Sequence, residues 1–271
     1  MGTHVANARV REPAVAGLFY PAEASELRAA VGELLAGPVA ADPRAATAKA
    51  LIVPHAGYAY SGPVAAAAYA QIAVRRRRIS QVVVIGPSHR AHFRGIALPE
   101  SDAFSTPLGE IRIDAAGKAK LRARGDVIIS DAPHDLEHCI EVQLPFLQTV
   151  LDDFTLLPLV AGQASAAYVA SVLEDVWGGP ETLILASSDL SHYHSYAVAQ
   201  RLDGQTAAAI LARRTDLTGE AACGAVAING LLARARDLGL VVEEIARLNS
   251  GDTAGDRTRV VGYGAFAIHD A

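Results

Sequence analysis

Histidine and aspartate residues follow three short apolar runs of the sequence, at the point where each run ends. The run LIVP leads to His55, the run VVVIGPS leads to His89, and the run LILASS leads to Asp189 and His192. In open α/β sheets the ligand site lies beyond the carboxyl ends of the strands, so we expect these side chains to meet at one edge. Imidazole nitrogens bind zinc, copper and iron, and a thiolate or carboxylate often completes the ligand set. The pattern therefore predicts a mononuclear metal site.

The chain has two cysteines, Cys139 and Cys223, which are too few for a disulfide framework and indicate reduced thiols or metal ligands. Cys223 opens a segment with a helical pattern, and the N-terminus of a helix stabilises a thiolate. It is therefore a candidate third ligand. The alternative interpretation is a small buried apolar residue.

A second pattern, HDLEH at 134–138, matches the H-x-x-E-H signature of one class of zinc peptidases. That chemistry needs both histidines on one face of a helix. Asp135 is the natural N-cap of a helix predicted to run to about Leu147, which leaves the first histidine outside it. His138 and Glu141 then lie as neighbours on its first two turns, and a zinc peptidase is disfavoured.

Serine hydrolysis and phosphate binding have weaker support. Ser187 and Ser188 lie close to Asp189 and His192, but the sequence has no G-x-S-x-G motif to hold a nucleophilic serine. Neither the P-loop pattern nor a G-x-G-x-x-G pattern occurs between a strand and a helix.

The elements that must position these residues alternate between strands and helices. The predicted strands are Ala50–Val53, Gln81–Ile85, Thr155–Val160, Thr182–Ala186 and Thr258–Ile268. The predicted helices begin near Pro63 (with Ser61 as N-cap) and near Asp135, and run over Ser165–Trp177, Ala197–Ala212 and Cys223–Leu238. This alternation predicts an α/β fold with a central, mostly parallel or mixed sheet flanked by helices. We expect one domain over residues 1–271, with a surface loop at Gly37–Thr47.

Composition and charge narrow the class of protein. Of 271 residues, 51% are apolar, and 24 basic against 29 acidic side chains give a net charge of −5. An acidic balance argues against nucleic-acid binding, which depends on neutralising phosphates. No apolar run reaches the roughly 18–20 residues that span a bilayer, and the N-terminus lacks the pattern of a signal peptide. We therefore expect a cytoplasmic protein that binds neither nucleic acid nor membrane.

Several ordered motifs carry a resemblance to a known family. They are PHAGYAYSG (54–62), IGPSHR (85–90), LEHCIEVQLPFLQ (136–148), ASSDLSHY (186–193), Cys223-Gly224, and NSGDTAGD with RVVGYGAFAI (249–268). Together they resemble the Memo family, whose bacterial and archaeal members are labelled protein B of the AmmeMemoRadiSam system. The resemblance covers a core from about residue 9 to residue 268.

The resemblance implies a fold similar to that of class III extradiol dioxygenases, which use non-haem Fe(II). It implies His55, His89 and Cys223 as the ligands of one metal ion. Cys223 then stands where the dioxygenases have a carboxylate. A thiolate is a softer ligand, which favours copper, zinc or a differently tuned iron. The implied cofactor is one Fe(II) or Cu ion, with Zn as an ion that purified protein also takes up.

The resemblance also implies roles around the ion. Asp189 would orient His192, whose ordinary pKa near neutrality makes it the acid/base candidate, and His138 joins them as a catalytic residue. The residues expected to line or brace the pocket are Phe19, Tyr58, Glu141 and Asp252. Phe19 stands where animal members carry tryptophan, and Cys139 is interpreted as a small helix residue where serine is common.

Two functions from different classes follow. The first is a metal-dependent redox enzyme of dioxygenase-like type that acts on a small molecule or peptide in the metal cleft. The second is a non-catalytic module that binds a peptide or small ligand in the same cleft. The family also implies a radical-SAM protein as a partner.

Overall fold

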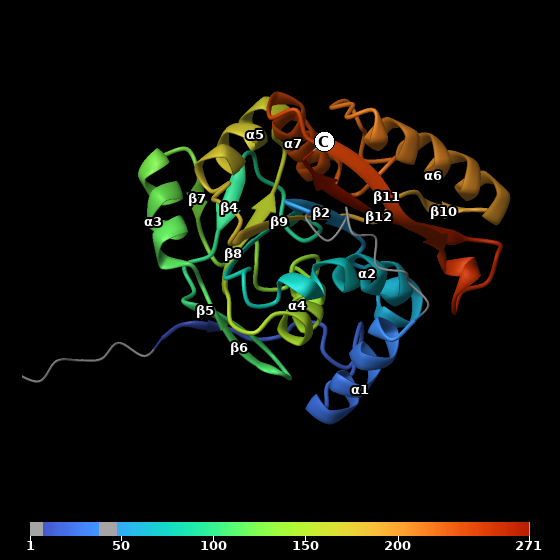
Figure 1. Ribbon diagram of the computed structural model, residues 1–271, viewed down its shortest axis with the longest axis horizontal. Coiled ribbons are helices and arrows are strands. Elements are labelled where there is room, and N and C mark those ends of the chain that lie inside the picture. The colour runs from blue at the N-terminus through green and yellow to red at the C-terminus, as the bar shows by residue number, and fades with distance from the viewer. Residues whose placement is uncertain (1–7, 38–47, 271) are drawn as a thin grey trace, which may run out of the picture.

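The computed structural model describes residues 8–37 and 48–270 of the chain. A sheet of nine strands runs through the molecule, and helices cover both of its faces (Figure 1). The seven α-helices of this part are α1 (Ala24–Leu35), α2 (Tyr58–Ile72), α3 (Ala115–Arg124), α4 (Leu144–Val150), α5 (Ala166–Asp175), α6 (Tyr196–Leu211) and α7 (Ala225–Asp237). None of these helices is both long and apolar enough to cross a membrane.

Four parallel strands form the centre of the large sheet, in the order β2-β9-β3-β8. Antiparallel strands flank them, because β12 pairs with β2 on one side and β4 pairs with β8 on the other. The strands are β2 (Ala50–Val53), β3 (Gln81–Pro87), β4 (Ile96–Leu98), β7 (Ile128–Ile129), β8 (Thr155–Ala161), β9 (Thr182–Ser187), β10 (His192–His194), β11 (Val241–Asn249) and β12 (Val260–His269). The predicted α/β fold with a mixed central sheet flanked by helices is therefore confirmed.

The central strands are apolar on both faces because helices cover both faces. In β2, Leu51 and Val53 belong to one hydrophobic core, while Ala50 and Ile52 belong to the other. Helices α1, α2 and α4 pack on the first face, and α3, α5, α6 and α7 pack on the second (Figure 1). A smaller sheet of β1 (Val10–Arg11), β5 (Ala103–Thr106) and β6 (Gly109–Arg112) completes the fold.

The predicted central strands lie where the sequence places them, but two predicted helix starts are wrong. Helix α2 begins at Tyr58, so Ser61 is inside it and is not its N-cap. The helix predicted from Asp135 begins only with a 3-10 turn at Glu141–Gln143, which leads into α4. Helices α1 and α3 and strand β11 were not predicted. Beyond Gly37, the predicted loop to Thr47 lies outside the described residues.

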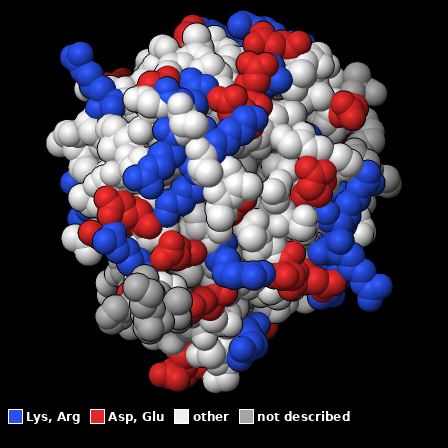
Figure 2. Space-filling view, turned by 90° about the vertical axis from the view of Figure 1, so that its left-hand side faces the viewer, with Lys and Arg blue, Asp and Glu red and all other residues white. Residues whose placement is uncertain are grey.

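Ion pairs hold α3, whose only buried residue is Leu121. Figure 2 shows the face on the left of Figure 1, where acidic and basic side chains are interspersed. Arg124 at the end of α3 pairs with Asp126 and with Asp175 of α5, and Lys120 lies 3.9 Å from the same Asp175 carboxylate. These ion pairs attach α3 to α5, because α3 has almost no apolar face of its own.

A buried ion pair anchors the N-terminal segment beside the site. Arg11 of β1 pairs with Glu141, and both side chains are buried. Arg11 also donates to two carbonyl oxygens of the 134–137 turn, at 3.1 and 2.6 Å. The Glu141 carboxylate accepts three further hydrogen bonds, from the backbone N–H groups of Ala14 and Val15 and from the Tyr20 hydroxyl. This network holds residues 11–20 against the segment that precedes α4.

The substitution Arg11→Met tests this anchor, because it leaves the Glu141 carboxylate buried without its cationic partner. We expect the free energy of unfolding to fall by about 3–5 kcal/mol, as for other broken buried pairs. Arg9→Met is the matched control: its pair with Glu100 is exposed, so the loss should stay below about 1 kcal/mol. Chemical denaturation measures both, and equal small losses would contradict the anchor.

Candidate metal centre

Three central strands deliver polar side chains to one edge of the sheet. His55 follows β2, His89 follows β3 and Asp189 follows β9, and these strands are parallel neighbours. His138 joins them from the segment before α4. One ring nitrogen from each of His55, His89 and His138 lies within 4.8 Å of the others, so the three histidines could hold one metal ion. The prediction that His55 and His89 meet at this edge therefore agrees with the geometry.

Cys223 lies beside His55 and is not a member of this group of three histidines. Its Sγ lies 3.2 Å from His55 Nε2, and it accepts the backbone N–H of Asp189 at 3.3 Å. A nitrogen and a sulfur bound to one ion at about 2.0 and 2.3 Å lie at most about 4.3 Å apart, so this separation fits two ligands of the same ion. Gly224 permits the approach, because a Cβ there would lie 2.5 Å from the Ser187 carbonyl oxygen.

The His55 ring is oriented by the end of β9. The Ser187 hydroxyl donates its hydrogen to the Cys139 carbonyl oxygen at 2.6 Å. The Ser187 oxygen therefore accepts the 2.9 Å hydrogen bond from His55 Nδ1, which places the ring hydrogen on Nδ1. The Nε2 lone pair then faces Cys223, where it accepts the thiol hydrogen or binds an ion.

Gln143 fixes Ser187 in turn. Its amide nitrogen donates to Ser187 Oγ and to the Pro54 carbonyl oxygen, both at 2.9 Å. Its amide oxygen accepts the Tyr69 hydroxyl at 2.7 Å. Each member of this chain of buried groups is hydrogen-bonded, so the orientation of His55 depends on a network that reaches the core of α2.

Glu137 does the same for His89. One carboxylate oxygen accepts His89 Nδ1 at 2.8 Å, and the other accepts the His89 backbone N–H at 2.6 Å. The backbone N–H groups of His138 and Cys139 also donate to Glu137, at 2.9 and 3.1 Å. A carboxylate on the distal nitrogen of a ligating histidine fixes its tautomer and strengthens it as a ligand. The H-x-x-E-H pattern did not predict this role of Glu137.

Burial favours the neutral imidazole at His55 and at His138. Burial lowers the pKa of His55 to about 3 and that of His138 to about 4, with repulsion from neighbouring histidines adding to the effect. Burial acts to raise the pKa of Glu137, but the hydrogen bonds from His89 and the backbone outweigh it and hold the pKa at about 2. Neutral imidazole is the form that binds metals. Burial also raises the pKa of the Cys223 thiol to about 12, so its thiolate needs a nearby cation.

Asp189 and His192 are both at the site but do not pair as predicted. The Asp189 carboxylate accepts the backbone N–H of His55 at 2.8 Å, and burial raises its pKa. His192 Nδ1 instead bonds the Leu190 carbonyl oxygen at 2.8 Å. His192 is therefore oriented by the main chain, which leaves its Nε2 available in the cleft.

The cluster lies in a cleft of about 840 Å³. Phe19 lines it as predicted, with its ring centroid 4.8 Å from that of His138. Further members of the lining that were not predicted are Tyr193, His194, Gly219, Glu220 and Val261. Tyr193 has a φ of 63°, an uncommon backbone conformation for a bulky residue.

Three residues predicted for the pocket lie elsewhere. Tyr58 is buried in the core, where its hydroxyl donates to the Val142 carbonyl oxygen at 2.7 Å. Glu141 is buried with Arg11 and braces the site from behind. Asp252 caps the Ser250–Asp252 turn and accepts the Tyr196 hydroxyl at 2.5 Å.

His134 is outside the cluster, and it lies outside a helix as predicted. Its ring is buried and bonds the Ala97 carbonyl oxygen at 3.1 Å, and residues 134–138 do not form a helix. The peptidase arrangement of two histidines on one helix face is therefore absent from these residues.

The fold and the cluster define an α/β protein with a candidate metal centre at the carboxyl ends of its parallel strands. Residues 11–267 match the family model described as Memo-like protein. The chain belongs to the Memo family.

Archaeal relatives are similar to this chain over nearly the whole length of both proteins. A MEMO1 family protein of Methanothermobacter thermautotrophicus is 34% identical over 94% of this chain and 98% of its own length. One from Metallosphaera sedula is 31% identical over 96% of this chain and 99% of its own. A crystal structure of an uncharacterized Escherichia coli K12 protein has a TM-score of 0.51 at 14% identity, covering 79% of this chain and 98% of that protein, which shows a shared fold alone.

Glu137→Gln tests the support of the cluster. The substitution removes the charge and turns an NH₂ group toward N–H donors, so His89 and the backbone of 138–139 lose acceptors. We expect zinc affinity, measured by competition with a chromophoric chelator, to fall about 10- to 100-fold. Glu220→Gln is the control, because Glu220 lines the same cleft but is exposed. Equal zinc affinity in Glu137→Gln and the unaltered protein would contradict the role of this carboxylate.

Proposed function

We propose that this protein is a mononuclear metal-dependent redox enzyme of dioxygenase-like type that uses non-haem iron or copper. The observation that supports it is the meeting of His55, His89 and His138 in one cleft, with the Cys223 sulfur 3.2 Å from His55 Nε2. Nitrogen and sulfur donors are the ligands that iron, copper and zinc accept in proteins.

His55, His89 and Cys223 are the proposed ligands. A bound iron or copper ion would supply the means to bind and activate O₂. Ser187 and Glu137 hold the two imidazoles with their ligating nitrogens toward the cleft. The Asp189 backbone N–H donates to the Cys223 sulfur, which stabilises the negative charge of a thiolate.

His138 and His192 are the proposed groups that move protons. The His138 ring lies nearly parallel to that of His89, at 4.7 Å between centroids. Its Nδ1 makes no hydrogen bond within the described residues, although a Glu137 carboxylate oxygen lies 3.3 Å from it. That geometry also allows His138 to be the third nitrogen ligand. In the proposed arrangement His138 and His192 face the substrate from two sides, and Phe19 covers His138 from solvent.

The substrate is proposed to be a small molecule or peptide that enters the 840 Å³ cleft. The proposed setting is the reducing cytoplasm, where both free thiols persist, and a radical-SAM protein is the proposed partner. The competing function is a binding module that uses the same cleft without turnover.

Elemental analysis of anaerobically purified, untagged protein, followed by an oxygen-uptake assay with a reductant, tests the proposal. We expect about one iron or copper per chain and metal-dependent O₂ consumption. Cys223→Ser should lose most of the metal, because the alkoxide of serine is a poor replacement for a thiolate. Cys139→Ser is the matched control: its thiol is buried and donates to the Pro87 carbonyl oxygen, and it should keep the metal.

Two outcomes would count against the proposal. Full metal content and unchanged O₂ uptake in Cys223→Ser would remove Cys223 from the ligand set. Inert zinc in both the unaltered protein and the variants would favour the binding module.

A further inference from the structure

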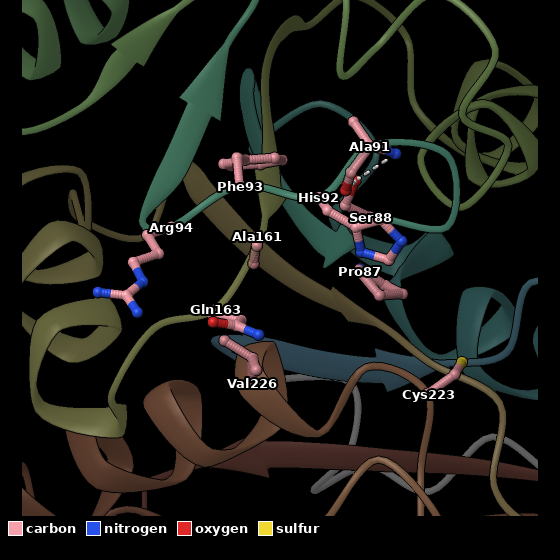
Figure 3. Close-up of a pocket in the computed structure, with 11 residues that line it drawn as sticks. Pro87, Ser88, Ala91, His92, Phe93, Arg94, Ala161, Gln163, Cys223 and Val226 are labelled. Atoms are coloured by element: carbon pink, nitrogen blue, oxygen red, sulfur yellow. Dashed lines mark hydrogen bonds between the residues drawn. The ribbon is translucent and has the colours of Figure 1, made fainter.

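A second cavity of about 420 Å³ adjoins the metal-centre cleft. It lies between the loop that follows β3, the end of β8 and the start of α7 (Figure 3). Among the described residues, Cys223 is the one that lines both this cavity and the cleft. A molecule in the second cavity therefore borders the residue that is proposed to bind the metal.

The walls of the second cavity are held by the main chain. Gly95 donates to the Gln163 carbonyl oxygen and Gln163 donates to that of Phe93, both at 2.9 Å. Gly162 completes this pairing by donating to Gly95 at 3.0 Å, and it passes so close that a Cβ would lie 2.3 Å from the Phe93 oxygen. The pairing fixes Arg94 and Gln163 beside each other on one wall.

The opposite part of the loop is also closed by hydrogen bonds. The Ser88 hydroxyl donates to the Ala91 carbonyl oxygen at 2.6 Å and lies 3.2 Å from the Ala91 nitrogen (Figure 3). This turn leads directly to His92. The polar side chains of the lining thus stand on a backbone whose position is set without any ligand.

The polar groups of the lining suit an anion. Arg94 is the only charged residue among those that line the cavity, and no aspartate or glutamate is among them. Within the described ranges, the side chains of Arg94, His92 and Gln163 have no ion pair or hydrogen bond. Figure 3 shows Arg94 on one side of the lining and His92 on the other, with Gln163 between them. A guanidinium fork beside an amide and an imidazole offers several N–H donors to the oxygens of a carboxylate or phosphate.

Much of the remaining lining is apolar, and part of it lies near the positive end of a helix dipole. Pro87 and Phe93 border the cavity, and Val226 belongs to the first turn of α7. The partial positive charge of a helix N-terminus adds to that of Arg94. Apolar surface beside donors favours an organic anion with a hydrophobic body over a bare inorganic ion.

We propose that the second cavity binds the carboxylate or phosphate group of a small organic anion, with Arg94 and Gln163 as the principal donors. The identity of this anion as the substrate of the metal centre rests on the function proposed above. The existence of the anion site does not rest on that function, because its donors stand on the loop after β3 and on the end of β8.

Isothermal titration of the full chain with benzoate and, separately, with inorganic phosphate tests the site. Arg94→Gln removes the cation, and we expect it to weaken the better-bound anion about tenfold or more. Arg90→Gln is the matched control: it removes the same charge from the same loop, but Arg90 lines neither cavity. Arg94 is exposed and unpaired in the described part of the chain, so the melting temperature should not change.

The two probes separate the chemistries. Tighter binding of benzoate assigns the site to carboxylates, and tighter binding of phosphate assigns it to phosphate groups. Equal affinity in Arg94→Gln and the unaltered protein, or an equal loss in Arg90→Gln, would overturn the proposal.

Titrations on metal-depleted and metal-loaded protein separate this inference from the proposed enzyme. Arg94-dependent anion binding without metal-dependent O₂ uptake would leave the anion site and remove the redox function. Metal-dependent O₂ uptake without Arg94-dependent anion binding would leave the redox function and remove the anion site.

Discussion

The segment from residue 137 to residue 143 is the element on which the site depends. It crosses the carboxyl ends of the central strands with polar groups that are buried, and each must find a partner there. Glu137 bonds His89, the Cys139 carbonyl oxygen accepts Ser187, and Gln143 bonds Ser187 and Pro54. Through these bonds one segment orients the histidines that follow β2 and β3. Gly86 makes the crossing possible, because a Cβ there would lie 2.5 Å from the Cys139 sulfur.

Buried charge explains why this segment is not a regular helix at its start. A carboxylate in the interior is tolerated only when charges or hydrogen bonds compensate it. Glu137 takes its partners from His89 at the end of β3 and from the backbone of its own segment, and Glu141 takes Arg11 from the N-terminal segment. Both needs are met by an irregular backbone that points the two side chains to different sides. For His55 and His138, burial outweighs the attraction of the Glu137 carboxylate for a positive charge. Both imidazoles therefore stay neutral.

The sequence predicts the parts of the fold and site that depend on local pattern. The apolar runs place β2, β3, β8 and β9, and their parallel order brings His55 and His89 together. Partners distant in sequence were missed. Glu141 and Tyr58 follow the site motifs, which predicts a place in the pocket for both. Instead, Glu141 pairs with Arg11, which is 130 positions away in the sequence, and Tyr58 is buried in the core. Helix α3 was missed because ion pairs and only one buried residue hold it.

Cys223 joins two environments that differ in character. On the side of the histidines its sulfur meets the buried, neutral imidazole of His55, while the second cavity presents a free guanidinium on an ordered wall. The sulfur is held at this junction by the Asp189 N–H and by the close approach that Gly224 allows. Hydrogen bonds and close backbone packing, and not a ligand, therefore set the position of the residue that borders both spaces.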